Sequence, residues 1–218
     1  MSYNQFRYTV QLNMKDQRCI VVGGGNVALR KTRSLLAAGA SVTVIAPMIL
    51  PAIIALQQSY PALSLYQREF RANDVTNAFL VVAATDNRKV NEMVALEANK
   101  HHTLLNVADD PDAGNFSVAG VYDNGGLHFS VATGGNPRLT HLLLEDLQLQ
   151  YGDNMNAFSV FLDEQRNQVK HKLASAQARQ DFWRNTLTIQ LLQDVKKGRL
   201  QQAKEIIINA VNRIGSES

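Results

Sequence analysis

The sequence predicts an α/β fold in which a doubly wound parallel sheet is followed by a hairpin and a helical segment. Three observations support this prediction. In the first half of the chain, short apolar runs rich in β-branched residues alternate with stretches of helical periodicity. A turn of three glycines joins one of these runs to a helix. From residue 137 onward every periodic segment is helical, so the later part of the chain lies outside the sheet.

The chain is organised around an apolar run at residues 19–22 that is followed by three glycines at 23–25. A helical pattern then spans 26–38 and stops at Gly39. Glycine lets the backbone turn tightly and leave room for a ligand, and the helix directs unpaired N–H groups and its positive dipole end at the same place. The six-residue motif ends in Ala28, an accepted variant of its third glycine. We interpret it as a dinucleotide site; the alternative is a glycine-rich turn that binds nothing.

Further strands and helices alternate on both sides of this motif. Pro47 ends a strand because it cannot continue a hydrogen-bonded ladder, and Pro51 begins a short helix. The run at 79–84 is apolar throughout, which is typical of a parallel strand covered on both faces, and residues 85–87 cap the next helix. In chain order the prediction is a strand at 8–12, strand 19–22, helix 26–38, strand 41–45, helix 51–58, strand 63–67, strand 79–84, helix 88–100 and strand 104–107.

A boundary is predicted near Asp112, where the chain becomes dense in turn-forming residues. Strands at 116–122 and 127–132 follow, and Asn124 with Gly125 suits a tight hairpin turn between them. A hairpin does not continue a parallel sheet, so a separate part of the fold begins here. The helices predicted beyond it lie at 137–149, 157–173, 182–192 and 200–214.

The amino-acid composition limits which partners the protein can bind and in which compartment it is expected. The net charge of +3 comes without a long Lys/Arg run, so we expect no nucleic-acid partner. No apolar run is long enough to span a bilayer and residues 1–10 lack the pattern of a secretory leader, so we expect a cytoplasmic protein without membrane contact. The single cysteine, Cys19, excludes an internal disulfide and is expected to be a small buried hydrophobe. The five histidines lack metal-ligand spacing, so no metal site is predicted.

Candidate site residues follow the ends of three predicted strands, where open α/β sheets bind ligands. Residues 46–48 offer neither an acid for ribose hydroxyls nor an arginine for a 2′-phosphate, which leaves both NAD and NADP open. Thr85 ends the fourth strand of the alternating pattern that starts at residue 19, either as a ligand contact or as a helix cap. Asp109, Asp110 and Asp112 follow the next strand and supply either a general base beside the cofactor or a solvated turn.

A second glycine turn joins the last predicted strand to the helix that begins at Pro137. The backbone N–H groups of Gly134 and Gly135, with the start of that helix, are suited to a carboxylate or a phosphate. The alternative is a tight connection between strand and helix that binds nothing.

Taken together, these motifs resemble the precorrin-2 dehydrogenase family, the N-terminal module of sirohaem synthase. The most specific parts are the glycine motif with its Arg-Lys tail at 21–31 and Asn-Val-x-Asp at 106–109. Ala-Ala-Thr-Asp at 83–86, Thr-Gly-Gly at 133–135 and Phe-Trp at 182–183 recur in the same order. The resemblance covers nearly the whole chain.

The resemblance implies an enzyme that oxidises precorrin-2, a tetrapyrrole, to sirohydrochlorin with NAD as cofactor, on the path to sirohaem. It implies a Rossmann-like NAD-binding domain at 1–112, a central dimerisation region of a homodimer at 113–150 and a helical domain at 151–218. Some members also insert iron into sirohydrochlorin, which leaves that activity open here. The main alternative is an NAD(H)-sensing regulatory module without turnover. A third hypothesis is a protein that carries a tetrapyrrole without converting it.

The resemblance also implies roles for individual residues. Asp109 takes the place of the family's essential aspartate. The cofactor contacts that it implies are Gly24, Gly25, Asn26, Val27, Pro47, Met48 and Thr85. Thr133 and Gly134 are expected to bind the substrate, and Arg138 and Lys31 are expected to pair with its carboxylates.

Overall fold

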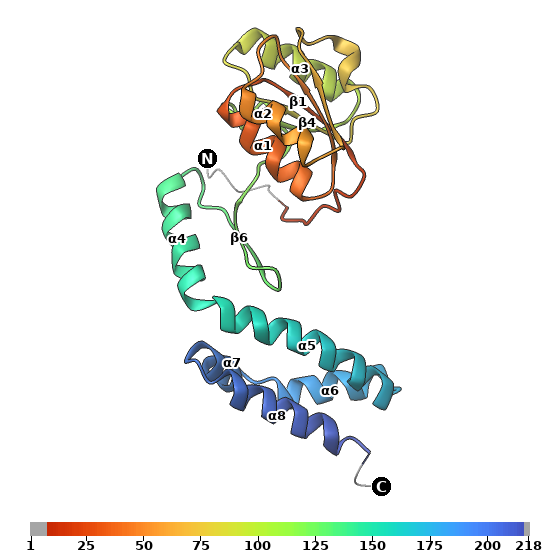
Figure 1. The fold of residues 1–218 in the computed structure, drawn as a ribbon, viewed down its shortest axis with the longest axis vertical. Coiled ribbons are helices and arrows are strands. Elements are labelled where there is room, and N and C mark those ends of the chain that lie inside the picture. Colours follow the sequence, from red (N-terminus) through yellow and green to blue (C-terminus); the bar gives the residue numbers. More distant parts are fainter. Residues whose placement is uncertain (1–7, 216–218) are drawn as a thin grey trace. The chain divides into compact units, whose positions relative to one another are not determined.

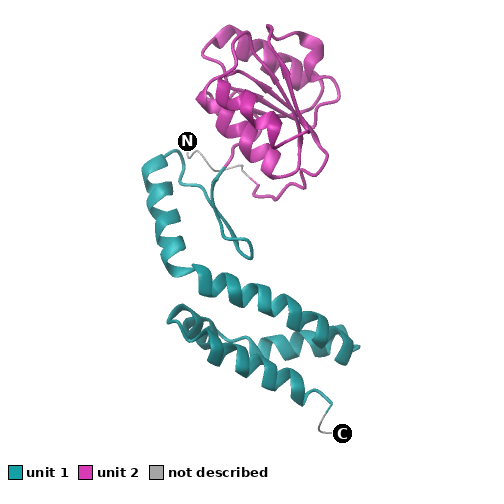
Figure 2. Cartoon of the chain, viewed as in Figure 1, with its two compact units in different colours: residues 1–6, 119–218 teal, residues 7–118 magenta. Residues whose placement is uncertain are grey.

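The computed structural model of the protein describes residues 8–215. The chain forms two compact units, of which the first ends at Val118 and the second begins at Ala119 (Figures 1 and 2). Each unit has a hydrophobic core of its own. The three-part division at residues 112 and 150 stays a prediction.

The first unit is built on a five-stranded sheet in which each strand runs parallel to its neighbours. In spatial order the strands are β3 (Leu63–Tyr66), β2 (Ser41–Ile45), β1 (Arg18–Val22), β4 (Leu80–Ala83) and β5 (Leu104–Val107). Val22 pairs with Ile45 and with Ala83, and Ala83 pairs with Val107. The carboxyl ends of β1, β2, β4 and β5 therefore meet at one edge of the sheet.

Helices cover both faces of this sheet, which confirms the doubly wound prediction. They are α1 (Asn26–Ala37), α2 (Pro51–Ala55), the 3₁₀ turns η1 (Leu56–Gln58) and η2 (Ala72–Val75), and α3 (Arg88–Lys100). On one face α1 and α2 contribute Ala28 and Ile53 to the core, and on the other η2 and α3 contribute Val75 and Val94. The connection from β3 to β4 uses only the short η2 turn.

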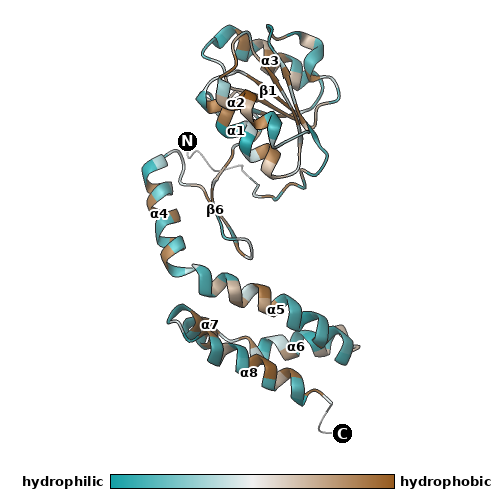
Figure 3. Ribbon diagram, in the orientation of Figure 1, coloured by the Kyte–Doolittle hydropathy of each residue, from teal (hydrophilic) through white to brown (hydrophobic). Residues whose placement is uncertain are grey.

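The central strand β1 is buried on both of its faces. Cys19 and Val21 join the core beneath α1, whereas Ile20 and Val22 join the core beneath α3. Figure 3 shows the apolar residues concentrated along the strands of this sheet. Burial raises the pKa of the Cys19 thiol to about 11. The prediction that Cys19 is a buried hydrophobe is confirmed, because its side chain is fully enclosed.

The predicted strand at residues 8–12 is wrong. These residues form no strand, and Tyr8 and Val10 are 89% and 55% exposed. An alternating pattern is stable as a strand only where a neighbour pairs with it, and no described strand of the protein does so. The strand predicted at 116–122 also starts later than predicted, at Gly120. Phe116 instead packs against the core beneath α1, and its N–H group donates to Leu105 O at 3.3 Å.

The second unit begins with an antiparallel hairpin and continues as helices. Its elements are β6 (Gly120–Asp123), β7 (His128–Val131), α4 (Pro137–Gln150), α5 (Asp153–Lys172), α6 (Ala176–Thr186), α7 (Ile189–Lys196) and α8 (Leu200–Arg213). The prediction of a single helix at 182–192 is wrong, because helix α6 ends at Thr186 and a new helix, α7, begins at Ile189. Thr188 is the N-cap residue of α7, and its Oγ1 accepts the N–H group of Leu191 at 3.3 Å.

Truncating Ile207 to alanine is expected to lower the free energy of unfolding of the second unit by about 2–5 kcal/mol, because its side chain is fully buried among α5, α7 and α8. The matched variant Ile206→Ala, at a neighbouring side chain that is 49% exposed, is expected to cost about 1 kcal/mol or less. Urea unfolding followed by the fluorescence of Trp183 measures both losses. Equal losses in the two variants would contradict this account of the core.

Candidate functional site

The glycine turn after β1 is a place of close backbone approach. Gly23 has a φ of +131°, and its N–H group donates to Ile45 O at 2.9 Å. A Cβ atom at this position would lie 2.2 Å from Ala84 O, so any other residue would clash with the backbone after β4. Glycine is therefore required here for the ends of β1, β2 and β4 to come together.

Gly24 packs against the loop that follows β2. A Cβ atom on Gly24 would lie 1.9 Å from Met48 O, and Gly24 O accepts the N–H group of Leu50 at 3.0 Å. Pro47 and Met48 are exposed beside this turn. The structure thus brings together two of the segments predicted to contact the cofactor.

The start of α1 is open. Gly25 is the N-cap residue, offers no side-chain hydrogen bond to the helix, and has no atom within 4 Å of a Cβ built on it. Asn26 and Val27, which follow it, are exposed. The first N–H groups of a helix lack intrahelical acceptors and carry the positive end of the helix dipole. This cradle fits a pyrophosphate group.

A hydrogen-bonded network links the ends of β4 and β5. The Oγ1 atom of Thr85 lies 2.7 Å from Asn91 Oδ1, and Asn91 Nδ2 donates to Thr85 O at 3.1 Å. The same Nδ2 atom donates to Asp109 Oδ1 at 3.3 Å. Asn91 is 4% exposed, whereas Asp109 is exposed. Two predicted site residues, Thr85 and Asp109, are thus joined through a buried amide.

Asn91 and Asn106 are polar groups at this edge that sequence reasoning did not assign to the site. Asn91 lies on the buried stripe of α3 with Val94 and Ala98, and an asparagine on such a stripe is the signal that was available. Asn106 is 7% exposed, and its Oδ1 atom has no hydrogen-bond partner among the described residues. Its Nδ2 atom donates to Phe116 O at 3.3 Å.

The three neighbouring aspartates differ in their surroundings. Asp110 Oδ1 accepts the N–H groups of Asp112 and Ala113, each at 3.2 Å, so the Asp110 carboxylate closes the turn. Asp109 and Asp110 both border a cavity of about 500 Å³, but the Asp109 carboxylate accepts the amide of the buried Asn91. The residues that line this cavity are Arg88, Asn91, Glu92, Ala95, Leu96, Asn99, Val107, Asp109, Asp110 and Ala113. Asp109 is therefore the carboxylate of the three that combines a buried partner with an open cavity.

Of the residues predicted to bind the substrate, Lys31 lies on α1 in the first unit, whereas Thr133, Gly134 and Arg138 lie in the second. Thr133 Oγ1 is 2.7 Å from Asn136 O and 2.6 Å from Thr140 Oγ1. Gly134 has a φ of +61° and no atom within 4 Å of a built Cβ, so the turn leaves free space around it. Arg138, in the first turn of α4, is exposed. The relation of these residues to those of the first unit stays a prediction.

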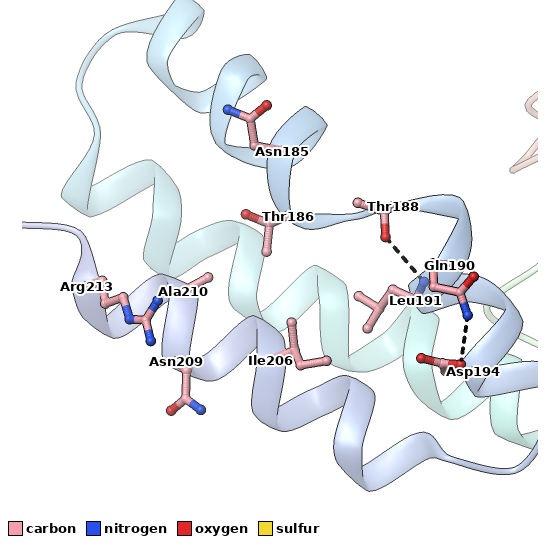
Figure 4. Close-up of a pocket in the computed structure, with 10 residues that line it drawn as sticks. All are labelled: Asn185, Thr186, Thr188, Gln190, Leu191, Asp194, Ile206, Asn209, Ala210 and Arg213. Atoms are coloured by element: carbon pink, nitrogen blue, oxygen red, sulfur yellow. Dashed lines mark hydrogen bonds between the residues drawn. The ribbon is translucent and has the colours of Figure 1, made fainter.

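A second cavity, of about 520 Å³, lies among α6, α7 and α8 (Figure 4). Its walls combine polar and apolar side chains, and the dashed bonds join Leu191 N to Thr188 Oγ1 and Gln190 to Asp194. It is lined by Asn185, Thr186, Thr188, Gln190, Leu191, Asp194, Ile206, Asn209, Ala210 and Arg213. None of the predicted site residues lies in it.

The described range, residues 8–215, offers neither a membrane-spanning helix nor a metal-binding cluster of side chains. No helix in this range is long and apolar enough to cross a membrane. Within the same range, no group of three or more His, Cys, Asp or Glu side chains is placed to hold a metal ion.

Comparisons with known proteins agree on one family. Residues 10–120 match a family model described as putative NAD(P)-binding, and residues 157–211 match one described as a sirohaem synthase dimerisation region. The second match lies beyond the hairpin region at 113–150 for which the resemblance implied dimerisation.

Individual relatives point the same way. The chain is 31% identical over 206 residues to a siroheme synthase of Nitrosomonas eutropha, which covers 94% of this chain and 43% of the relative. It is 36% identical over 195 residues to siroheme synthase 1 of Aeromonas salmonicida, with coverage of 88% and 42%. The chain thus spans about two fifths of the length of these curated relatives. A solved structure described as "SirC, precorrin-2 dehydrogenase" matches 91% of this chain and 100% of its own, with a TM-score of 0.74 and 28% identity.

Proposed function

This chain belongs to the family of sirohaem synthase N-terminal, precorrin-2 dehydrogenase modules, and from that membership we propose that it oxidises precorrin-2 to sirohydrochlorin with NAD⁺. The first unit is an NAD(P)-binding domain. The observation that carries the proposal is the open glycine cradle at the same sheet edge as the Thr85–Asn91–Asp109 network. Removal of one hydride and one proton from the substrate balances the reaction.

The cofactor is assigned to the edge where β1, β2 and β4 end. The backbone N–H groups at Gly24, Gly25, Asn26 and Val27 would hold its pyrophosphate, supported by the uncapped start of α1. Pro47 and Met48 lie beside this turn and would contact the adenosine half, while Thr85 would lie near the nicotinamide. When bound, NAD⁺ supplies the hydride acceptor.

Asp109 is assigned as the group that accepts the proton. Its Oδ1 atom is held by Asn91, and its carboxylate borders the cavity between α3 and the loop after β5. A carboxylate fixed at one oxygen keeps the other available for proton transfer. Asp110 does not share this role in the proposal, because its carboxylate closes its own turn through the N–H groups of Asp112 and Ala113 and has no bond to Asn91.

The substrate carries many carboxylates, and this chain offers cations for them. Burial, and after it the charge of Arg30, lowers the pKa of the Lys31 ammonium group, which has no ion-pair partner among the described residues. An anion placed against this lysine would stabilise its charged form and raise its pKa again. Arg138 and the amide of Gly134 are assigned to further carboxylates of the substrate.

The proposal is tested by mixing the purified protein with precorrin-2 and NAD⁺ and following NADH by absorbance. Formation of NADH and sirohydrochlorin in equal amounts, well above the rate without protein, is the expected result. Binding of NAD without any turnover would favour the NAD(H)-sensing alternative. Binding of the tetrapyrrole alone would favour a carrier.

Iron insertion is a separate prediction, tested by adding Fe²⁺ or Co²⁺ to sirohydrochlorin with and without the protein.

The protein is further proposed to act as a homodimer, which the match to a dimerisation region supports. None of the side chains of α4 is buried, although Leu139, Leu142 and Leu143 share one face of it and are 45%, 44% and 40% exposed. Exposed leucines at this spacing form an apolar stripe that a second copy of the chain can cover.

Changing Leu142 to glutamate is expected to convert the dimer to a monomer, because a charge would be buried in the proposed interface without a partner. Gln148→Glu, at an exposed polar position of the same helix, serves as the matched control and should remain dimeric. Light scattering after size-exclusion chromatography gives both masses. A dimer that persists in Leu142→Glu would place the interface elsewhere.

A further inference from the structure

We infer that Asn91 is a positioning residue for this reaction: its side-chain amide holds the Asp109 carboxylate in place relative to Thr85. The inference rests on the proposed function, since Asp109 and Thr85 are the residues assigned to the proton and to the nicotinamide side. It is carried by the hydrogen bonds of Asn91 and by its burial.

The bonding of Asn91 uses both ends of its amide. The Oδ1 atom lies 2.7 Å from Thr85 Oγ1 and accepts the Thr85 N–H group at 3.4 Å. The Nδ2 atom has two protons, and it donates one to Thr85 O at 3.1 Å and one to Asp109 Oδ1 at 3.3 Å. An aspartate could accept from Thr85 but could not donate to either oxygen, and a leucine could do neither. Asparagine is therefore the residue that suits this pair of neighbours.

The location of Asn91 favours a role at the site over a role in packing. It lies in the second turn of α3, on the stripe that otherwise buries Val94 and Ala98. A polar side chain on such a stripe weakens the core unless its bonds are made. Part of its bonding serves the backbone of Thr85, which a purely structural residue would also do. The bond to Asp109 directs the second Nδ2 proton to an exposed carboxylate, and it fixes one oxygen of that carboxylate.

The pH dependence of the reaction separates the two roles. The charged groups that line the cavity together with Asp109 are Arg88 and Glu92 on α3 and Asp110 beside it in the loop. Asn91→Asp keeps the size of the side chain and adds a second carboxyl within hydrogen-bond distance of Asp109. Two carboxyl groups this close titrate as a pair, and one apparent pKa rises. The acidic limb of the kcat profile is expected to move up by about one pH unit or more.

Asn91→Leu removes the donor without adding a charge. We expect kcat to fall by about 10–100-fold, because the carboxylate loses its fixed orientation, while KM for NAD⁺ changes by less than about threefold. Thr103→Val is the matched control. It removes one buried hydrogen bond, from Thr103 Oγ1 to Ala78 O, at the opposite end of β5, and it should leave kcat and the pH profile unchanged.

The experiment measures kcat and KM across pH for the unsubstituted protein and the three variants, together with an NMR titration of the Asp109 carboxyl group in cofactor-free protein. The inference is supported if Asn91→Leu lowers kcat without a comparable change in KM, and if the titration midpoint of Asp109 is higher in Asn91→Asp than in the unsubstituted protein. It is overturned if kcat in Asn91→Leu matches that of Thr103→Val, or if Asn91→Asp leaves the midpoint unmoved. Should Asn91→Leu fail to fold, the isosteric Asn91→Asp variant decides.

The failure of the inference is distinguishable from failure of the proposed function. An unsubstituted protein that forms no NADH contradicts the proposed function. In that case the NMR titration still shows whether Asn91 and Asp109 interact. A protein that turns over normally with Asn91→Leu contradicts the inference alone.

Discussion

Replacing Asp109 with asparagine is expected to lower kcat for precorrin-2 oxidation by about 10²–10⁴-fold, the range that removal of a general base produces. The amide has the shape of the carboxylate but cannot accept a proton at neutral pH. Its oxygen can still accept the Nδ2–H group of Asn91, and the side chain is exposed, so the fold and NAD binding are expected to survive. Absorbance of NADH in single-turnover and steady-state assays measures the loss.

Asp110→Asn is the matched control for this experiment. Asp110 is adjacent in sequence and borders the same cavity, but its carboxylate closes the turn to Asp112 and Ala113. We expect its kcat to stay within a few-fold of that of the unsubstituted protein. If Asp109→Asn kept more than a tenth of the activity, or if both variants lost equal activity, Asp109 would not be the proton acceptor.

Substitutions in the glycine turn are expected to have opposite consequences at neighbouring positions. Gly25→Ala adds a methyl group where no atom lies within 4 Å, at a φ of −90° that alanine adopts readily. Its stability should fall by only about 1 kcal/mol, the difference between these residues at an N-cap. The same methyl group would occupy the space assigned to the pyrophosphate. Affinity for NAD is therefore expected to fall by about 10–100-fold, equal to the loss of about one hydrogen bond to a charged group.

Gly23→Ala provides the contrast. Its Cβ atom would lie 2.2 Å from Ala84 O, and the φ of +131° is strained for alanine. We expect a loss of about 3 kcal/mol or more in the free energy of unfolding of the first unit. Thermal unfolding and calorimetry with NAD measure the two effects. A Gly25→Ala protein that is stable and binds NAD normally would remove the glycine cradle from the cofactor site.

The sheet and its helices could be predicted because each element carries its own period and its own boundary residue. The strand predicted at 79–84 and the helix at 88–100 correspond to β4 and α3, and the helix begins where Asn87 accepts the N–H groups of Lys89 and Val90. The segment at 8–12 shows the limit. Its alternation is that of a strand, but strand formation depends on a neighbour that the local sequence does not specify.

The candidate site divides in the same manner. Thr85 and Asp109 could be nominated from their places after two parallel strands, since such ends meet at one edge. Their connection through Asn91 could not be predicted. The hydrogen bond between α3 and the loop after β5 is a tertiary contact between residues far apart in the sequence, and a local sequence pattern does not indicate such a contact. Thr188 shows the same limit in the second unit. The apolar period at 182–192 continues across Thr188, but in the structure this residue caps the start of a new helix. The roles of the individual site residues stay predictions.

Calorimetric titration of the folded protein with NAD⁺ is the most direct test of the central claim that the turn at residues 23–27 holds a nicotinamide dinucleotide. We expect one site per chain, filled at micromolar to low millimolar NAD⁺, that is lost or greatly weakened in Gly25→Ala. Well-folded protein that takes up neither NAD⁺ nor NADP⁺ at millimolar concentration would contradict it.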